Sequence, residues 1–380
     1  MMRQKSSARF RFDGAALLLI VLAFLLPALR DGDRRIYLLA AAVSVAMLLC
    51  VTLLARMFSL DRMILSLVLY LCAAGILALI TDPDAAEMQA LRSLAGTAFL
   101  LVGALAARGL APSLLTACAS GFLGLLLLSA RLLVPSLSVD LTGPGLALLM
   151  VSLSALLSLY GAFPALAAGI AGLILLFLQQ AALWEAIIWS LSFLLLLWAA
   201  DSRPLAVFSG LAAVLLLFFG VFRVRPEDLV PAAVPDASGL SALLSAGLFG
   251  SDTPAEALLS LGTDSLFPRL AGYLGLIFAG LTAILFLPLT LRGVSIASCA
   301  RKRYHAVLAM GAVLPIAFRA LAALLSSFGI IPLPALALPL LTTSLPALCG
   351  QMFLIGILCG ISGKNEDDLN DDAHLAMLAR

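Results

Sequence analysis

Charged side chains are scarce in this chain. Asp, Glu, Lys and Arg make up 12% of its 380 residues, whereas hydrophobic residues make up 63%. A soluble globular domain carries about 25% charged residues, so the composition excludes that class and predicts a polytopic membrane protein. The net charge of +2 does not favour nucleic acid as a partner, because the positive residues are scattered between apolar runs.

Metal-ligating patterns are also lacking. The two histidines, His305 and His374, are far apart in the chain, which argues against a histidine metal site. None of the six cysteines forms a CxxC pair, and most of them lie inside apolar runs, where cysteine behaves as a small hydrophobic residue. The sequence therefore indicates neither a disulfide framework nor a metal site.

Long apolar runs make up most of the chain. A transmembrane helix needs about 20 apolar residues. The first apolar run is not followed by the small-residue cleavage site of a signal peptide, so we expect it to be retained as a span. The sequence predicts an all-α fold with about twelve spans, at 14–29, 36–55, 63–80, 93–108, 113–133, 145–161, 163–180, 183–200, 204–222, 270–291, 304–328 and 335–361. Only the letters GAF separate the sixth span from the seventh.

Lysine and arginine predict how these spans face. They are in excess in the segments on the side of the N-terminus, most clearly at Arg301, Lys302 and Arg303, and such segments face the cytoplasm. Both termini are therefore predicted to be cytoplasmic, and the long loop 223–269 extracytoplasmic. The run LSALLSAGLFG within this loop predicts a helix against the membrane surface. Residues 363–380 are predicted to form an acidic, mobile cytoplasmic tail.

Ionisable residues inside the spans are few, and such residues are functional candidates in a membrane. Glu185 lies near a helix end and can simply reach the interface, whereas Arg319 lies deeper and needs a polar cavity or a snorkelling position. In the long loop, Asp264 has two interpretations. It is either an ordinary solvated acid, or a general base that takes a proton from an acceptor hydroxyl while a pyrophosphate leaves beside Arg131 or Arg269.

Several motifs follow one another in the last third of the chain. They are SAGLFG at 245–250, TDSLF at 263–267, LG at 274–275 and FRALAALLSSFGIIPLPALALPLLTTSLPAL at 318–348. Their order and spacing resemble the SEDS family of shape, elongation, division and sporulation proteins (FtsW, RodA and SpoVE). In that family the elements read approximately Gly-Leu-Phe-Gly, His-Thr-Asp-Phe-Ile-Phe, Leu-Gly, and Phe-Gln-Ala followed by Gly-Leu-Leu-Pro and Pro-Leu-Pro-Phe-Ile-Ser-Tyr-Gly-Gly.

Weaker similarity to the same family continues upstream. The run DRMILSLVLYLCAAGILAL from Asp61 resembles its first helix, and LLFLQQAALWEA resembles its Leu-Gln-Pro-Asp-Leu-Gly-Thr-Ala motif. The resemblance implies a ten-helix membrane core over residues 61–362. Residues 1–60 would then form a cytoplasmic N-terminus and an extra two-helix hairpin.

The resemblance also implies a function. It implies a peptidoglycan glycosyltransferase that polymerises lipid II on the outer face of the bacterial cytoplasmic membrane, in cell division, elongation or sporulation. Asp264 would be the general base, and Thr263, Arg131, Arg269 and Arg319 would contact the substrate. The implied partner is a class B penicillin-binding protein, together with other division or elongation membrane proteins. A divalent metal is one candidate for the cation that meets the pyrophosphate, although no ligand cluster identifies it.

Several polar positions of the family are replaced here. The replacements are Gly262 for His, Gly272 and Tyr273 for a Glu pair, Thr342, Thr343, Ser344 and Leu345 for Ser-Tyr-Gly-Gly, Leu133 for Trp, Gly145 for Glu, Leu148 for Lys and Ala181 for Asp. Two interpretations stay open: an altered glycosyltransferase, and a catalytically impaired scaffold of a cell-wall synthesis complex. A lipid or solute transporter is disfavoured, because neither midplane charge pairs nor an inverted repeat is evident in the sequence.

Overall fold

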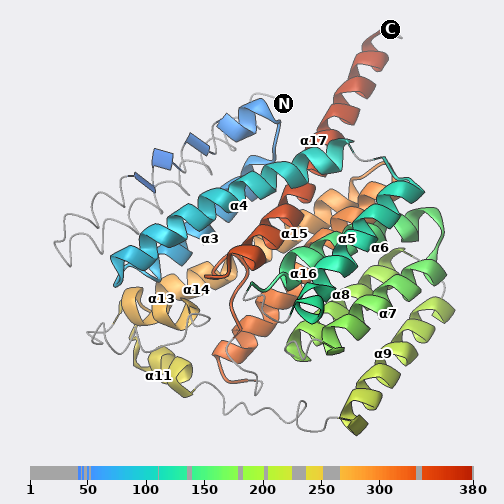
Figure 1. Cartoon of the computed structure of the whole chain (residues 1–380). Helices are drawn as coiled ribbons and strands as arrows, with labels where there is room; N and C mark the ends of the chain where they lie inside the picture. Colours follow the sequence, from blue (N-terminus) through green and yellow to red (C-terminus); the bar gives the residue numbers. More distant parts are fainter. Residues whose placement is uncertain are drawn as a thin grey trace.

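The computed structural model is a bundle of α-helices (Figure 1). It describes several positions between 42 and 50 and residues 53–109, 111–134, 139–178, 183–200, 204–224, 237–250, 266–330 and 336–378. No β-strand occurs within these ranges, so the predicted all-α fold is confirmed. The predicted span 14–29 lies outside the described residues, as does much of 36–55, and the count of twelve spans stays a prediction.

Ten apolar segments run back and forth through the bundle. They are α3 (Arg62–Leu77), α4 (Pro83–Gly109), α5 (Leu114–Leu133), α6 (Thr142–Leu159), α7 (Ala162–Leu178), α8 (Leu183–Ala200), α9 (Pro204–Val224), the consecutive pair α14 (Leu276–Ile284) and α15 (Phe286–Ser298), α16 (Arg303–Ser327) and α17 (Leu345–Leu378). Two short helices, α11 (Ala237–Ser245) and α13 (Leu266–Leu274), lie at one end of the bundle, which we call the loop end (Figure 1). The C-terminal part of α17 leaves the opposite end, which we call the tail end.

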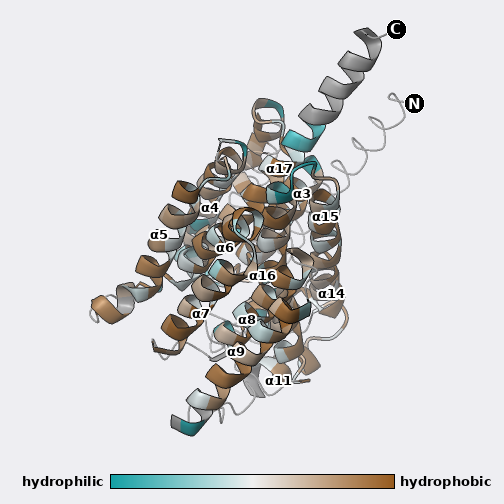
Figure 2. Ribbon diagram, turned by 90° about the vertical axis from the view of Figure 1, so that its right-hand side faces the viewer, coloured by the Kyte–Doolittle hydropathy of each residue, from teal (hydrophilic) through white to brown (hydrophobic). Residues whose placement is uncertain are grey.

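The outward-facing sides of these helices are strongly apolar, and Figure 2 shows hydrophobic colour along most of the bundle. Phe122, Leu205 and Leu216 are 70%, 75% and 70% exposed. Within the described residues, five helical segments are long and apolar enough to cross a membrane, and five more are shorter apolar helices. Water-soluble proteins rarely expose apolar surface on this scale, whereas a bilayer accommodates it. The protein is therefore a membrane protein, as its composition predicts.

Local signals explain several helix boundaries. The Met63 amide donates to the Asp61 carboxylate at 3.0 Å, which caps α3. Ser113 and Thr116 form a capping box at the start of α5. Gly161, with φ of 85°, separates α6 from α7. The two predicted spans are therefore separate helices, and Ala162 and Phe163 already belong to α7.

One boundary on α4 differs from the prediction. The helix begins at Pro83 and not at residue 93. Proline is favoured at the first helical position, and the Ala85 amide donates to the Asp82 side chain at 3.2 Å. The polar stretch before residue 93 is therefore helical, although its composition resembles a loop.

Helices α4 and α17 approach each other closely through glycine. A Cβ atom added at Gly356 would lie 2.0 Å from the carbonyl oxygen of Leu100. One added at Gly360 would lie 2.4 Å from the carbonyl oxygen of Ala104. Gly356 and Gly360 have the GxxxG spacing that allows helix backbones to approach in membranes, where packing replaces the hydrophobic effect as the driving force.

Polar side chains connect four helices at the tail end. The Asp61 carboxylate accepts hydrogen bonds from Arg292 of α15 at 2.8 Å and from the Ser362 hydroxyl of α17 at 3.1 Å. Arg108 of α4 donates to the carbonyl oxygen of Ser59 at 3.3 Å. The Asp61 side chain is only 6% exposed, and a charge so buried needs partners of this kind. The contacts place the start of α3 beside α17 at the tail end.

The turn at 247–250, which carries the letters GLFG, docks on a break between α13 and α14. Gly275 lies at this break with φ of 94°. The first two amides of α14 donate to the carbonyl oxygens of Gly247 and Leu248 at 3.0 and 3.3 Å. The residues on either side of the stretch 251–265 are therefore held at the loop end. Helix α11 also packs against α13 there.

The predicted span 270–291 is wrong at its start for the same reason. The continuous membrane segment is Leu276–Ser298, because the backbone leaves helical geometry at Gly275. Hydropathy alone does not reveal this break, since the residues on both sides of it are apolar. The helix predicted in the run LSALLSAGLFG is present as α11, while its contact with a membrane surface stays a prediction.

Replacing Gly275 with alanine is expected to lower the free energy of unfolding by about 2–4 kcal/mol. The new Cβ would lie 2.4 Å from backbone atoms of Leu248 and Gly250, at a positive φ that disfavours L side chains. Thermal unfolding of the purified protein in detergent measures this loss. Gly280→Ala on α14 is the matched control, because nothing lies within 4 Å of its added Cβ. Equal melting temperatures for the two variants would contradict the docking role of Gly275.

The predicted span 335–361 is also wrong at its start, because α17 begins at Leu345. Residues 336–344 are irregular and largely buried in the bundle. Leu340 has φ of 66° and is fully buried. A residue in this conformation cannot continue a right-handed helix, so the apolar run alone gives the wrong boundary.

Two glutamines support the irregular segment. The Leu340 amide donates to the side-chain oxygen of Gln351 at 2.7 Å. The side-chain amide of Gln89, on α4, donates to the carbonyl oxygen of Thr342 at 3.0 Å. Non-helical backbone at membrane depth is tolerated where the protein itself supplies such partners.

Residues 363–378, predicted as a mobile acidic tail, continue the helix α17 to Leu378. Figure 1 shows this part of α17 projecting beyond the bundle. The Asn365 side chain donates to the carbonyl oxygen of Ile296 at 3.2 Å, which joins the beginning of the extension to α15.

Candidate functional site

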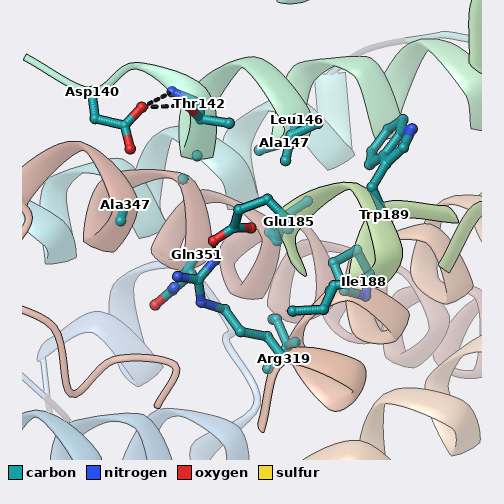
Figure 3. A pocket seen from close by; sticks show the side chains of 15 residues that line it. Asp140, Thr142, Leu146, Ala147, Glu185, Ile188, Trp189, Arg319, Ala347 and Gln351 are labelled. Atoms are coloured by element: carbon teal, nitrogen blue, oxygen red, sulfur yellow. Dashed lines mark hydrogen bonds and ion pairs between the residues drawn. The ribbon is translucent and has the colours of Figure 1, made fainter. Parts of the chain in front are cut away.

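A cavity lies between α6, α8, α16 and α17, toward the loop end. It is lined by Asp140, Thr142, Gly143, Leu146, Ala147, Glu185, Ile188, Trp189, Pro315, Ile316, Arg319, Ala347, Gly350, Gln351 and Leu354. On each helix these residues recur at spacings of three or four, which places them on one face. Figure 3 shows Glu185, Arg319 and Gln351 close to one another in the cavity, with Asp140 and Thr142 together at its edge.

Arg319 and Glu185 form an ion pair in this cavity. The Nη1 atom of Arg319 lies 2.7 Å from Oε1 of Glu185, and their side chains are 21% and 20% exposed. The two residues are 134 positions apart in the chain. Arg319 therefore faces a cavity, one of the positions expected from the sequence, and Glu185 is its partner and not a separate interfacial residue.

The guanidinium of Arg319 retains unused donors. Its Nε atom is buried and has no hydrogen-bond partner among the described residues. An arginine side chain has five N–H donors and is always charged in proteins. A buried donor without a partner costs about 1–3 kcal/mol or more, so the site suits a group that accepts hydrogen bonds.

Two further polar groups frame the cavity. The side-chain oxygen of Gln351 accepts a hydrogen bond from the backbone amide of Leu340. The side-chain NH2 group of Gln351 points away from that contact and can donate two hydrogen bonds. The Asp140 carboxylate accepts from the amide of Thr142 at 3.0 Å and from its hydroxyl. Asp140 is therefore occupied with the start of α6, whereas Arg319 and Gln351 present donors.

The cavity is small. Its volume is about 80 Å³, compared with about 300–1,000 Å³ for pockets that enclose a drug-sized ligand. In this conformation it accommodates one small polar group, not a whole lipid-linked sugar.

Arg269 lies in another environment. It is on α13 and only 7% exposed. Burial lowers the pKa of its guanidinium, and the Asp82 carboxylate from the α3–α4 connection opposes that shift. Arginine stays charged after such a shift, so Arg269 supplies positive charge at the loop end without lining the cavity of Arg319.

The structure thus separates the predicted site residues. Arg319 lines the cavity and Arg269 does not. Asp264 and Thr263 lie outside the described residues, and Arg131 belongs to α5 but its side chain is not described. Their roles stay predictions. Within the described ranges, no group of three or more His, Cys, Asp or Glu residues is placed to hold a metal ion.

Sequence reasoning missed Gln351 and Asp140 as cavity residues. Gln351 is the only strongly polar side chain in the run LPALCGQMFLIG, and that isolation in an apolar helix was the available signal. The pairing of Glu185 with Arg319 had no local signal, because it depends on how α8 meets α16.

Comparison with known proteins identifies the class. The model of the FtsW/RodA/SpoVE family, described as cell cycle proteins, matches residues 237–367. Proteins from two strains of Geobacter sulfurreducens, each named probable peptidoglycan glycosyltransferase FtsW, are 28% identical over 209 residues, which is 50% of this chain and 56% of theirs. The matched region therefore spans about half the length of these curated relatives.

Solved structures show the same fold. A chain of a peptidoglycan synthase complex, studied for the coordination of polymerization and crosslinking, aligns with a TM-score of 0.61 and 20% identity, over 80% of this chain and 98% of that one. The rod shape determining protein RodA of Thermus thermophilus aligns with a TM-score of 0.57 and 18% identity, over 81% and 98%. The protein is thus an α-helical membrane protein with a RodA-like fold. Residues 237–367 match the FtsW/RodA/SpoVE family model, and the chain resembles members of that family in sequence and in fold.

Proposed function

We propose that the protein is a peptidoglycan glycosyltransferase that polymerises lipid II, or a related undecaprenyl-pyrophosphate-linked sugar, on the outer face of the bacterial cytoplasmic membrane. The observation that carries this proposal is the family match over 237–367, which includes the loop with Asp264 and the helix with Arg319. The relatives named as glycosyltransferases support it. Cell division, elongation and sporulation are all compatible settings.

Asp264 would act as the general base in this reaction. The acceptor hydroxyl gives its proton to the carboxylate and forms a bond to the anomeric carbon of the donor sugar. The bond from that carbon to the pyrophosphate breaks, and the lipid pyrophosphate leaves with the electron pair. Positive charge must stabilise this leaving group. Arg319, Arg269 and Arg131 are the candidates among the protein's residues, with Thr263 beside the base.

A reconstituted assay tests the activity directly. The purified protein is mixed with a class B penicillin-binding protein, the partner proposed for it, and with fluorescent lipid II. Glycan polymer resolved on a gel is the expected result, and a mixture without this chain is the control. Failure to form polymer, together with full complementation of a deletion strain by Asp264→Ala, would contradict the proposed glycosyltransferase activity. The scaffold function would then remain.

The catalytically impaired scaffold is the second candidate, and one packing detail favours it. Gly145 stands where the resembling family has a loop Glu. A Cβ at this position would lie 3.0 Å from the Leu128 side chain and 3.1 Å from the carbonyl oxygen of Gly124. The α5–α6 packing is therefore tight at this position, and an acidic side chain there would require its neighbours to shift. In this reading the protein organises a cell-wall synthesis complex without polymerising lipid II.

We further propose that the loop end faces outward and that both termini are cytoplasmic. Cysteine labelling tests this orientation. Leu248, which is 63% exposed in the turn at the loop end, is replaced by cysteine in a variant that keeps Cys299 as its only other cysteine. Cys299 is exposed and lies just after α15, at the tail end. In intact cells an impermeant maleimide is expected to label position 248 alone, and Cys299 only after the membrane is opened. The reverse order would invert the orientation.

A further inference from the structure

We infer that Arg319 and Gln351 form a binding site for a phosphate-type oxyanion, and that Glu185 is a built-in competitor that occupies Arg319 until the anion arrives. The site is the cavity between α6, α8, α16 and α17. That the anion is the pyrophosphate of a lipid-linked sugar rests on the proposed function. The existence of an anion site does not.

The donors in the cavity support an anion. The guanidinium of Arg319 makes one ion pair, and its buried Nε has no partner among the described residues. The side-chain oxygen of Gln351 is held by the Leu340 amide at 2.7 Å, which turns its NH2 end away from that contact. Figure 3 shows Arg319 and Gln351 pointing into the same space.

The acids in the cavity have separate tasks. The Asp140 carboxylate already accepts from Thr142, so it is committed to the start of α6. Only Glu185 contacts Arg319 in a described salt bridge. Carboxylate and phosphate bind arginine through the same fork of N–H donors. A phosphate-type oxyanion and Glu185 therefore compete for one guanidinium.

Two features of the cavity permit this competition between Glu185 and the oxyanion. The pair is partly open to solvent, at 21% and 20% exposure, so Glu185 can leave Arg319 without stranding a deeply buried charge. The cavity of about 80 Å³ has room for one small charged group but not for a larger ligand. Phosphate binding at Arg319 would release the Glu185 side chain from this ion pair.

Binding of inorganic pyrophosphate tests the inference. The full chain is placed in phosphatidylcholine nanodiscs without divalent metal and titrated calorimetrically. Glu185→Gln keeps the shape of the side chain and is expected to bind pyrophosphate about tenfold tighter than the wild type. Arg319→Gln is expected to bind about tenfold weaker or not measurably. Gln351→Leu in the Glu185→Gln background is expected to lose part of the gain.

Matched variants guard the interpretation. Glu87→Gln removes the same charge from an exposed position on α4 and is expected to leave affinity unchanged. Glu185→Ala repeats the test should the glutamine variant fold poorly, and melting curves verify each variant. The double variant Glu185→Gln/Arg319→Gln should bind as weakly as Arg319→Gln alone. If Glu185→Gln binds no tighter than the wild type, or the double variant keeps the gain, the inference is wrong.

A second set of nanodiscs, which contain phosphatidylglycerol, tests whether the site binds a pyrophosphate group or a lipid headgroup. An unchanged pyrophosphate affinity supports a pyrophosphate-bearing ligand. Displacement of pyrophosphate that depends on Arg319 supports the same anion site with a lipid headgroup as its occupant. A protein that binds pyrophosphate in this way but forms no glycan polymer would refute the proposed function and keep the anion site.

Discussion

Asp264→Asn is expected to lower the rate of glycan polymerisation by about 10²–10⁴-fold, the usual contribution of a general base. The amide has nearly the same shape as the carboxylate but cannot take the proton of the acceptor hydroxyl. The initial rate of polymer formation from fluorescent lipid II, with the transpeptidase held constant, measures the effect. Asp264→Glu, which keeps the base on a longer side chain, is expected to retain part of the rate.

Asp252→Asn is the matched control, because Asp252 lies in the same stretch between the turn at 247–250 and α13. It is expected to keep nearly full activity. Melting temperatures of both asparagine variants should equal that of the wild type, which separates a catalytic effect from a folding defect. Equal rates for Asp264→Asn and the wild type would show that Asp264 is not the base.

Gly356→Ala is expected to destabilise the protein by about 3 kcal/mol or more, as severe overpacking does. The new methyl group would lie 2.0 Å from the carbonyl oxygen of Leu100. That atom belongs to the backbone of α4 and cannot move without displacing the helix. The two helices must separate, which loosens the crossing that also supports Gln89 and Gln351 around the irregular segment.

Thermal unfolding in detergent measures the effect of Gly356→Ala, and Gly220→Ala on α9 is its control. Nothing lies within 4 Å of a Cβ added at Gly220, so alanine there is expected to be neutral or to stabilise by up to about 1 kcal/mol through helix propensity. Similar melting temperatures for the two alanine variants would show that the α4–α17 crossing adapts without cost.

The two effects concern different levels of the molecule. Gly356 supports the bundle and is expected to change stability before activity. Asp264 is expected to change the rate alone. A protein that is stable but inactive in Asp264→Asn, and unstable in Gly356→Ala, would behave as a membrane enzyme whose scaffold and reactive loop are separable.

The amino-acid sequence by itself determined the class of the protein and most of its helices. Apolar runs of membrane length, interrupted by glycine or capped by residues such as Asp61 and Ser113, are local features. Span 183–200 coincides with α8, and 204–222 differs from α9 by two residues. The motifs around Asp264 also carried the family resemblance without any knowledge of the fold.

Only the tertiary structure decided where the helices stop inside apolar runs. The positive φ angles at Gly275 and Leu340 depend on a turn docked from elsewhere in the chain and on a glutamine side chain that accepts the Leu340 amide. Because the residues on both sides of each break are apolar, hydropathy does not reveal where the helix stops.

The tertiary structure also decided which charges meet. Glu185 and Arg319 are each visible in the sequence as rare ionisable residues within spans, but their ion pair joins positions 134 residues apart. Asp61 and Arg292 are joined in the same way at the opposite end of the bundle. The sequence determines which residues need a partner, because a charge in a membrane is costly alone. Which partner each one finds depends on helix packing, a property of the whole bundle and of no single segment.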